Sequence, residues 1–95
     1  MPAESALEKT CRLFVEEQNG RFPKWTSPGS PGVCDRILLI PGCPVVFVEL
    51  KAKNGKLSRL QKLWLGWLRT AGFQAWVISD YFDFVESVEA LMEMS

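Results

Sequence analysis

The sequence contains no histidine, and this absence excludes several kinds of chemistry at once. Serine-type triads, histidine general bases and histidine-ligated metals all need the imidazole ring. Any catalysis must therefore use carboxylates, lysine, cysteine or the single tyrosine of the chain.

Cysteines and long apolar runs are also scarce. The three cysteines, Cys11, Cys34 and Cys43, have no C-x-x-C spacing, and their odd number argues against a disulfide framework or a zinc site. No apolar run approaches the roughly 18 residues that a membrane span needs, and no segment reads as a secretory signal. We therefore expect a soluble protein of a reducing cytoplasm with no membrane partner.

Charge of one sign is not in excess either. Eleven basic and eleven acidic residues give a formal net charge of zero, so any basic surface must be local. The chain has 95 residues, 47% of them hydrophobic, and four tryptophans. This composition predicts one domain over residues 1–95 with a single packed core.

The residue patterns predict an α/β fold. The expected elements are a helix over 3–18, a short strand around 24–26, strands in "CDRILLI" and "PVVFVELK", a helix over 57–71 ended by Gly72, a strand in "FQAWVIS" and a helix in "DYFDFVESVEALMEM". The apolar stripe expected on the second helix is Leu57, Leu60, Trp64, Leu68 and Ala71. The order α-β-β-β-α-β, followed by a C-terminal helix, predicts a mixed central sheet with helices packed on it.

The two strands joined by "PGC" form a predicted hairpin with a defined register. If Gly42 centres the turn, paired residues lie symmetrically about it, so Leu38 faces Val46 and Asp35 faces Glu49. Lys51 follows Glu49 by two residues and projects from the same face. The hairpin therefore gathers two acids and a lysine at one end.

Two readings of these three charges stay open. An ordinary solvated surface cluster is the simpler one. However, the charges directly follow an apolar segment, 45–48, that is typical of a central strand, and opposed acids there need a compensating cation. An Asp and a Glu beside water form the oxygen-rich kind of site that magnesium or manganese prefers.

The segment "GVCDRILLIPGCPVVFVELKAKNGKLSRLQ" resembles the VRR-NUC branch of the PD-(D/E)xK nuclease superfamily, and the resemblance extends from "ESALE" to "WVIS". Asp35 matches the Asp of the PD element, Glu49-Leu50-Lys51 matches ExK, and Gln61 matches the glutamine of the following helix. Cys34 replaces the usual proline of the motif. Because that proline shapes the backbone and is not a ligand, we expect activity to survive the change.

The resemblance implies a restriction-endonuclease-like core and metal-dependent hydrolysis of phosphodiester bonds in DNA. It implies that Mg²⁺ or Mn²⁺ is held by Asp35, Glu49, the Leu50 carbonyl and an acid of the first helix. Lys51, helped by Gln61, would position the attacking water. Small stand-alone viral members suggest a homodimer acting on branched DNA such as four-way junctions, in the cytoplasm of a bacterial or virus-infected host cell.

The acid from the first helix is either Glu4 or Glu8. Spacing to the "NGRF" turn favours Glu8, whereas the helical wheel puts Glu4 nearer the apolar stripe. Ser5 to Glu8 also reads as a capping box, in which the acid only satisfies backbone N–H groups. Ser58 to Gln61 has the same pattern, so Gln61 has the same alternative role.

The remaining cations suggest a surface for DNA. Five of them fall within one short segment: Lys51, Lys53, Lys56, Arg59 and Lys62. Lys24, Ser27 and Arg36 flank the Pro-Gly loop and are further candidates for phosphate contacts. The alternative is a plain solvated loop and helix face.

The second predicted helix is apolar nearly all round, since Trp64 and Trp67 accompany Leu63 and Leu65. Such a helix needs a second covering surface besides its own sheet. A homodimer through the apolar C-terminal half would supply it. The functional alternatives to an autonomous nuclease are a non-catalytic docking module for DNA or protein, and a nuclease active only with a partner.

Overall fold

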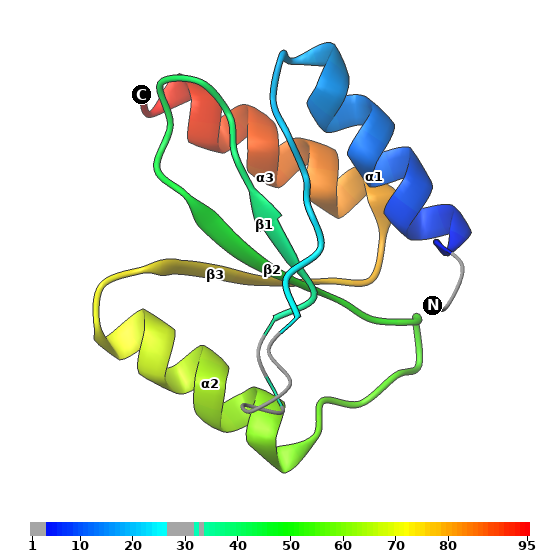
Figure 1. The fold of residues 1–95 in the computed structure, drawn as a ribbon, viewed down its shortest axis with the longest axis vertical. Coiled ribbons are helices and arrows are strands. Elements are labelled where there is room, and N and C mark those ends of the chain that lie inside the picture. Colours follow the sequence, from blue (N-terminus) through cyan, green and yellow to red (C-terminus); the bar gives the residue numbers. More distant parts are fainter. Residues whose placement is uncertain (1–3, 27–31, 33) are drawn as a thin grey trace.

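The computed structural model describes residues 4–26, 32 and 34–95, which fold as three helices and a three-stranded sheet (Figure 1). The elements in chain order are α1 (Ala6–Glu17), β1 (Arg36–Leu38), β2 (Val46–Leu50), α2 (Arg59–Thr70), β3 (Gln74–Ile78) and α3 (Tyr81–Glu93). Among the described residues, no helix has both the length and the apolar character that crossing a membrane requires.

The sheet is mixed, with β2 in its centre. β1 pairs with β2 antiparallel, and β2 pairs with β3 in parallel. Leu38 faces Val46 and Arg36 faces Val48, which confirms the register predicted from Gly42. Gly42 itself has a φ of 81°, a left-handed conformation that glycine adopts without strain.

The strand expected around residues 24–26 is reduced to two isolated bridges beside β1, one between Arg21 and Leu39 and one between Lys24 and Arg36. Pro23 lies between them and has no N–H to donate, although its carbonyl accepts a hydrogen bond from Ile37. A regular ladder is therefore interrupted at this point. The segment still covers the outer edge of β1.

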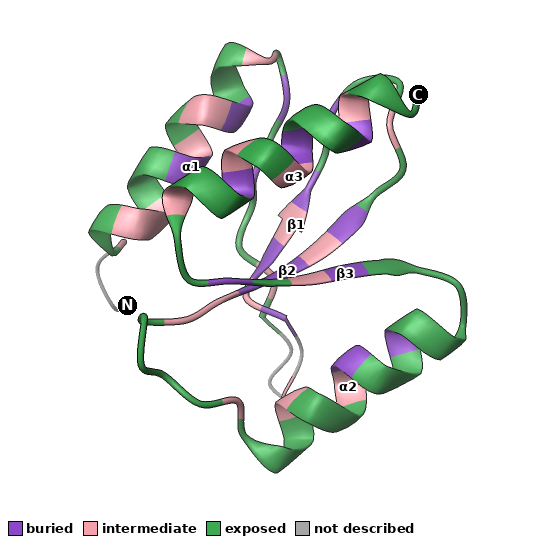
Figure 2. Cartoon of the chain, turned by 180° about the vertical axis from the view of Figure 1, so that it is seen from behind, coloured by how far each residue is buried: buried purple, intermediate pink, exposed green. Residues whose placement is uncertain are grey.

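The sheet separates two apolar clusters. Figure 1 shows α1 and α3 side by side on one face of the sheet and α2 on the other. The larger cluster joins α1 and α3 to the hairpin, and its buried members are Cys11, Val15, Phe22, Leu38, Ile40, Val46, Val48, Ile78, Phe84, Val88 and Leu91. The smaller cluster lies under α2 and contains Cys34, Leu65, Leu68 and Ala75. In Figure 2 the buried residues follow the strands and the inner sides of the helices.

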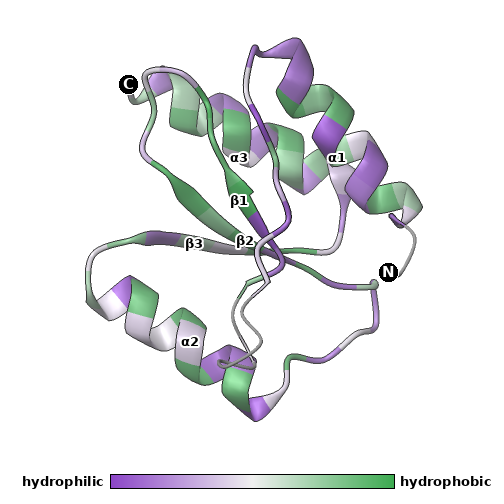
Figure 3. Ribbon diagram, viewed as in Figure 1, coloured by the Kyte–Doolittle hydropathy of each residue, from purple (hydrophilic) through white to green (hydrophobic). Residues whose placement is uncertain are grey.

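The face that α2 turns to the sheet differs from the predicted stripe. Leu65 and Leu68 are its buried residues, whereas Leu60 is 46% exposed. Polar and apolar residues alternate along α2 in Figure 3, and the apolar side of the helix is broad enough to allow more than one buried stripe. Packing against Cys34 and Ala75 selects the face instead. Leu60, Leu63 and Trp67 remain largely exposed on α2.

Candidate active site

The predicted pair of acids meets where β1 begins and β2 ends. Asp35 immediately precedes β1, and its Oδ2 accepts a hydrogen bond of 3.1 Å from the backbone N–H of Leu50. Leu50 stands between Glu49 and Lys51, so the Asp35 carboxylate is fixed beside the ExK segment. Asp35, Glu49 and Lys51 are therefore brought together as the register predicted.

Glu49 lies beneath the surface, on the α2 side of the sheet, with only 1% of its area exposed. Its Oε2 accepts a hydrogen bond of 3.0 Å from Nε2 of Gln61 and lies 3.7 Å from Nζ of Lys51. Its Oε1 has no hydrogen-bond partner among the described residues. Burial and the neighbouring Asp35 raise the pKa of Glu49 well above its ordinary value, and Lys51 offsets only part of this effect.

Gln61 makes two contacts, one in the cap of α2 and one to Glu49. It completes the capping box of α2, where its Oε1 accepts a hydrogen bond of 2.8 Å from the N–H of Ser58. The nitrogen of the same amide reaches Glu49. The first turn of α2 therefore contacts Glu49 directly.

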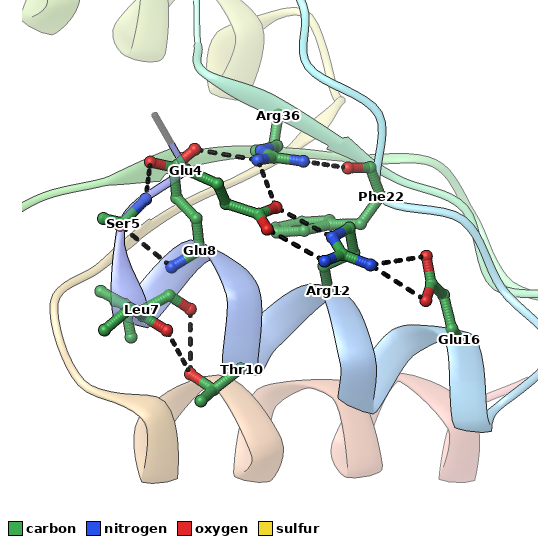
Figure 4. Close-up of polar contacts among 10 residues, drawn as sticks. Glu4, Ser5, Leu7, Glu8, Thr10, Arg12, Glu16, Phe22 and Arg36 are labelled. Carbon is green, nitrogen blue, oxygen red and sulfur yellow. Dashed lines mark hydrogen bonds and ion pairs between the residues drawn. The ribbon is translucent and has the colours of Figure 1, made fainter. Parts of the chain in front are cut away.

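The two candidate acids make different contacts (Figure 4), and only Glu8 belongs to α1, because the helix begins at Ala6 and Glu4 lies before its N-cap, Ser5. Glu4 binds Arg12 through both carboxylate oxygens and also binds Arg36. The hydrogen bond from Arg12 is the main reason that the pKa of Glu4 falls to about 2. Glu8 closes the capping box with Ser5 and binds Arg36 at 2.9 Å. Burial raises the pKa of Glu8, but the hydrogen bonds from Arg36 and Ser5 outweigh it and leave the pKa below its ordinary value.

A hollow of about 650 Å³ opens beside this site. It is lined by Ser5, Ala6, Leu7, Glu8, Lys24, Trp25, Thr26, Asp35, Leu50, Lys51 and Ala52. Glu8 is among these residues and Glu4 is not. The hollow joins the first turn of α1 to Asp35 and Lys51, which is the arrangement expected if Glu8 is the acid supplied by the first helix.

The sequence predicts Arg36 as a DNA-binding cation, and the structure corrects this prediction. Its side chain is 4% exposed, and its guanidinium binds Glu4, Glu8 and the carbonyl of Phe22 (Figure 4). It also lies over the Phe22 ring, 5.4 Å from the centroid. Arg36 is therefore a buried structural cation that ties α1 to β1. Its position two residues before the buried Leu38 was the signal, because alternate residues of a strand share one face.

The other predicted DNA contacts lie on the surface near the site. Lys53, Lys56, Arg59 and Lys62 are exposed on the segment after β2 and on the first turn of α2. Lys24 is exposed and lines the hollow. Ser27 lies outside the described residues. Trp25 and Thr26 also line the hollow, and their position in a Pro-rich loop gave no signal for this.

The donors present fit a divalent cation of the magnesium type. No group of three or more Asp, Glu or Cys side chains within the described part of the chain is arranged to hold a metal by itself. Magnesium, however, is usually held by one or two carboxylates together with water. Ionising the buried Glu49 beside Asp35 is costly, and its Oε1 accepts no hydrogen bond from the described residues. A cation at Asp35 and Glu49 would remove this cost.

Comparisons with known proteins agree with the fold. No family model matches the chain. It is 36% identical over 58 residues to a phage protein named "Putative nuclease p44", from Acyrthosiphon pisum secondary endosymbiont phage 1. That match covers 61% of this chain and 62% of the phage protein, so it spans less than two thirds of the relative.

A solved structure described as "VRR_NUC domain" superimposes with a TM-score of 0.82 at 23% sequence identity. The superposition covers 90% of this chain and 94% of the solved one. It confirms the fold expected from the "CDRIL" and "VELK" segments, including the mixed sheet between helices. The chain therefore has the fold of the VRR_NUC domain.

Proposed function

We propose that the chain is a metal-dependent DNA endonuclease of the PD-(D/E)xK type. The observation that carries the proposal is the buried Glu49 at the end of the central strand, close to Asp35 and Lys51, with one oxygen that has no partner within residues 4–26, 32 and 34–95. Burying a carboxylate beside another acid is costly, and packing alone gives no reason for it. The name of the phage relative and the VRR_NUC fold support the same reaction class.

In this proposal Asp35, Glu49, the Leu50 carbonyl and Glu8 hold Mg²⁺ or Mn²⁺. The Leu50 carbonyl is placed for this role because the N–H and C=O of one strand residue point to the same side, and the Leu50 N–H points to Asp35. A bound divalent cation would supply positive charge to the scissile phosphate and promote deprotonation of the attacking water.

Lys51 is the proposed catalytic cation of the chain itself. Its ammonium group lies 3.7 Å from Glu49, and the residue lines the open hollow. Lys51 would donate hydrogen bonds that orient the attacking water and stabilise negative charge growing on the phosphate. Because Glu49 keeps Lys51 close to Asp35, the lysine would be oriented before substrate arrives.

The exposed cations next to the hollow would bind the DNA backbone. Lys24, Lys53, Lys56, Arg59 and Lys62 would neutralise phosphates without reading sequence. Branched DNA, such as a four-way junction, is the proposed substrate, and this preference rests on the family resemblance stated above. The expected location in the cytoplasm of a bacterial or virus-infected cell stays a prediction.

A homodimer is the second part of the proposal. Leu63 and Trp67 on α2, and Phe73 after it, are each at least half exposed, at 58%, 59% and 50%. Large apolar side chains gathered in this way are typical of an interface. A symmetric dimer through this C-terminal half would cover them and would present two sites to one branched substrate.

The test is cleavage of matched labelled substrates: a four-way junction, a flap, a plain duplex and a single strand, each with Mg²⁺ or Mn²⁺. The Glu49→Ala protein is the matched control. We expect metal-dependent cutting that the control lacks and that is fastest on branched DNA. No cutting of any substrate by the folded protein would favour a docking module or a nuclease that needs a partner.

A further inference from the structure

The side chain of Gln61 is held at both ends of its amide. The carbonyl oxygen, Oε1, accepts a hydrogen bond of 2.8 Å from the N–H of Ser58, the N-cap of α2. The nitrogen, Nε2, donates one of 3.0 Å to Oε2 of Glu49. The hydroxyl of Ser58 in turn accepts from the N–H of Gln61 at 3.1 Å.

The helix cap therefore decides which end of the amide meets Glu49. An amide carbonyl is only an acceptor and its NH₂ only a donor, so the two ends are not interchangeable. With Oε1 engaged by Ser58, Nε2 is turned toward the carboxylate. This is the end that an ionised Glu49 can accept.

The contact has a direct consequence for Glu49. Gln61 and Lys51 both approach Oε2, whereas the other oxygen, Oε1, is the one without a partner among the described residues. The carboxylate is thus fixed through one oxygen and leaves the other for a ligand. Gln61 has this effect without being a ligand itself.

We propose that Gln61 is a positioning residue, which orients Glu49 for a divalent cation, and that the cap at Ser58 orients Gln61. This rests on the proposed function, since it concerns the same cation site. In this proposal Gln61 does not position the attacking water, as the resemblance implied, but holds the metal ligand Glu49 through a hydrogen bond. Hydrogen-bond partners of metal ligands typically contribute about 10- to 100-fold to metal affinity.

The measurement is the dissociation constant of Mn²⁺ alone, without DNA, determined by calorimetry and by electron paramagnetic resonance of the free ion. Gln61→Met removes both polar ends of the amide but keeps an unbranched side chain of similar length. We expect about 10- to 100-fold weaker Mn²⁺ binding by this variant. Circular dichroism would verify that the variant is folded.

A matched pair at Ser58 isolates the cap. Ser58→Ala removes the hydroxyl but keeps the N–H that holds Gln61. Ser58→Pro removes both, and the φ of Ser58, −69°, is one that proline adopts. Both variants lose the cap hydroxyl, so its effect on helix stability is common to them. We expect Mn²⁺ binding close to that of the wild type for Ser58→Ala and several-fold weaker binding for Ser58→Pro.

The outcomes separate this inference from the proposed function. Unchanged Mn²⁺ binding by Gln61→Met, with binding lost in Glu49→Ala, overturns the role of Gln61 and leaves the cation site standing. Equal affinities for Ser58→Pro and Ser58→Ala overturn the role of the cap. Failure of the wild-type chain to bind Mn²⁺, or wild-type binding by Glu49→Ala, overturns the cation site and this inference with it.

Discussion

The carboxylate of Asp35, just before β1, accepts a hydrogen bond of 3.1 Å from the backbone N–H of Leu50, the last residue of β2. This bond fixes the acid of one strand beside the main-chain oxygen of the other. Asp35 thus has two properties that could matter, its ability to accept this hydrogen bond and its negative charge. The two can be tested independently.

Asp35→Asn keeps an oxygen that can accept the hydrogen bond from Leu50 but removes the charge. We expect it to retain most of the stability of the wild type, to bind Mn²⁺ weakly and to cut DNA at least about 100-fold more slowly. Asp35→Ala loses the bond as well and should also be less stable, by about 1 kcal/mol. Urea unfolding and single-turnover cleavage of both variants make the comparison. If Asp35→Asn cut DNA at the wild-type rate, the negative charge of Asp35 would not be required for cleavage.

Lys51→Ala tests the catalytic cation. The protein should fold and bind Mn²⁺, while cleavage falls by about 10²- to 10³-fold, because a donor to the developing charge is lost. Lys9→Ala removes the same charge from an exposed position on α1 and is the control. Cleavage by Lys51→Ala equal to that of Lys9→Ala would contradict the role of Lys51.

Glu49 should make the metal-free protein less stable as pH rises. Burial, with a contribution from Asp35, raises its folded pKa from 4.5 to about 8, so the folded state favours the protonated form. Its stabilising contribution is complete below pH 4.5 and is lost as pH rises through about 8. Relative to Glu49→Gln, the wild type should lose a few kcal/mol between these limits, since one pKa unit corresponds to about 1.4 kcal/mol.

Urea unfolding of the wild type and Glu49→Gln across this pH range measures the difference. Added Mn²⁺ should reverse the loss for the wild type at high pH, because the cation favours the ionised carboxylate. Parallel stability curves for the two proteins would show that Glu49 does not titrate as described.

Arg36 should matter for stability far more than Arg12, although both bind Glu4. Arg36→Met removes the buried guanidinium that binds Glu4, Glu8 and the Phe22 carbonyl, and should lower the free energy of unfolding substantially. Arg12→Met removes the more exposed partner of Glu4, 31% accessible, and should lower the free energy of unfolding much less. Denaturant melts of the two variants decide between them. Equal losses would mean that burial of Arg36 adds nothing.

Trp67→Glu tests the proposed dimer. A charge placed on the exposed face of α2 should leave the fold intact and reduce the particle mass from two chains to one, as measured by light scattering. Leu13→Glu changes a similarly exposed leucine on α1, at 43%, and should not alter the mass. A wild-type chain that is already monomeric would refute the dimer directly.

The position of the acids could be predicted from the sequence because it depends on local rules. Symmetry about Gly42 and the two-residue repeat of strands are enough to place Asp35 beside Glu49 and Lys51. The start of α2 could be predicted for the same reason, since its capping box lies within four consecutive residues. Each of these features is decided by near neighbours in the chain.

The features that could not be predicted depend on distant partners. The buried face of α2 is the one that packs on Cys34 and Ala75, and the apolar side of the helix is broad enough that its sequence does not indicate this choice. The contacts of Glu4 and Glu8 depend on Arg36, which lies 32 and 28 residues away. Its charge alone predicts Arg36 on the surface, but ion pairs with Glu4 and Glu8 stabilise it in a buried position.

The parallel pairing of β2 with β3 also bears on when the candidate site can form during protein synthesis. Lys51 donates its backbone N–H to the carbonyl of Ile78, so the strand that carries the acids gains its second neighbour only when β3 is present. A growing polypeptide on the ribosome has Asp35, Glu49 and Lys51 long before it has Ile78. We expect the β3 side of this strand to stay unpaired in the nascent chain until β3 leaves the exit tunnel, so the proposed cation site would form only then.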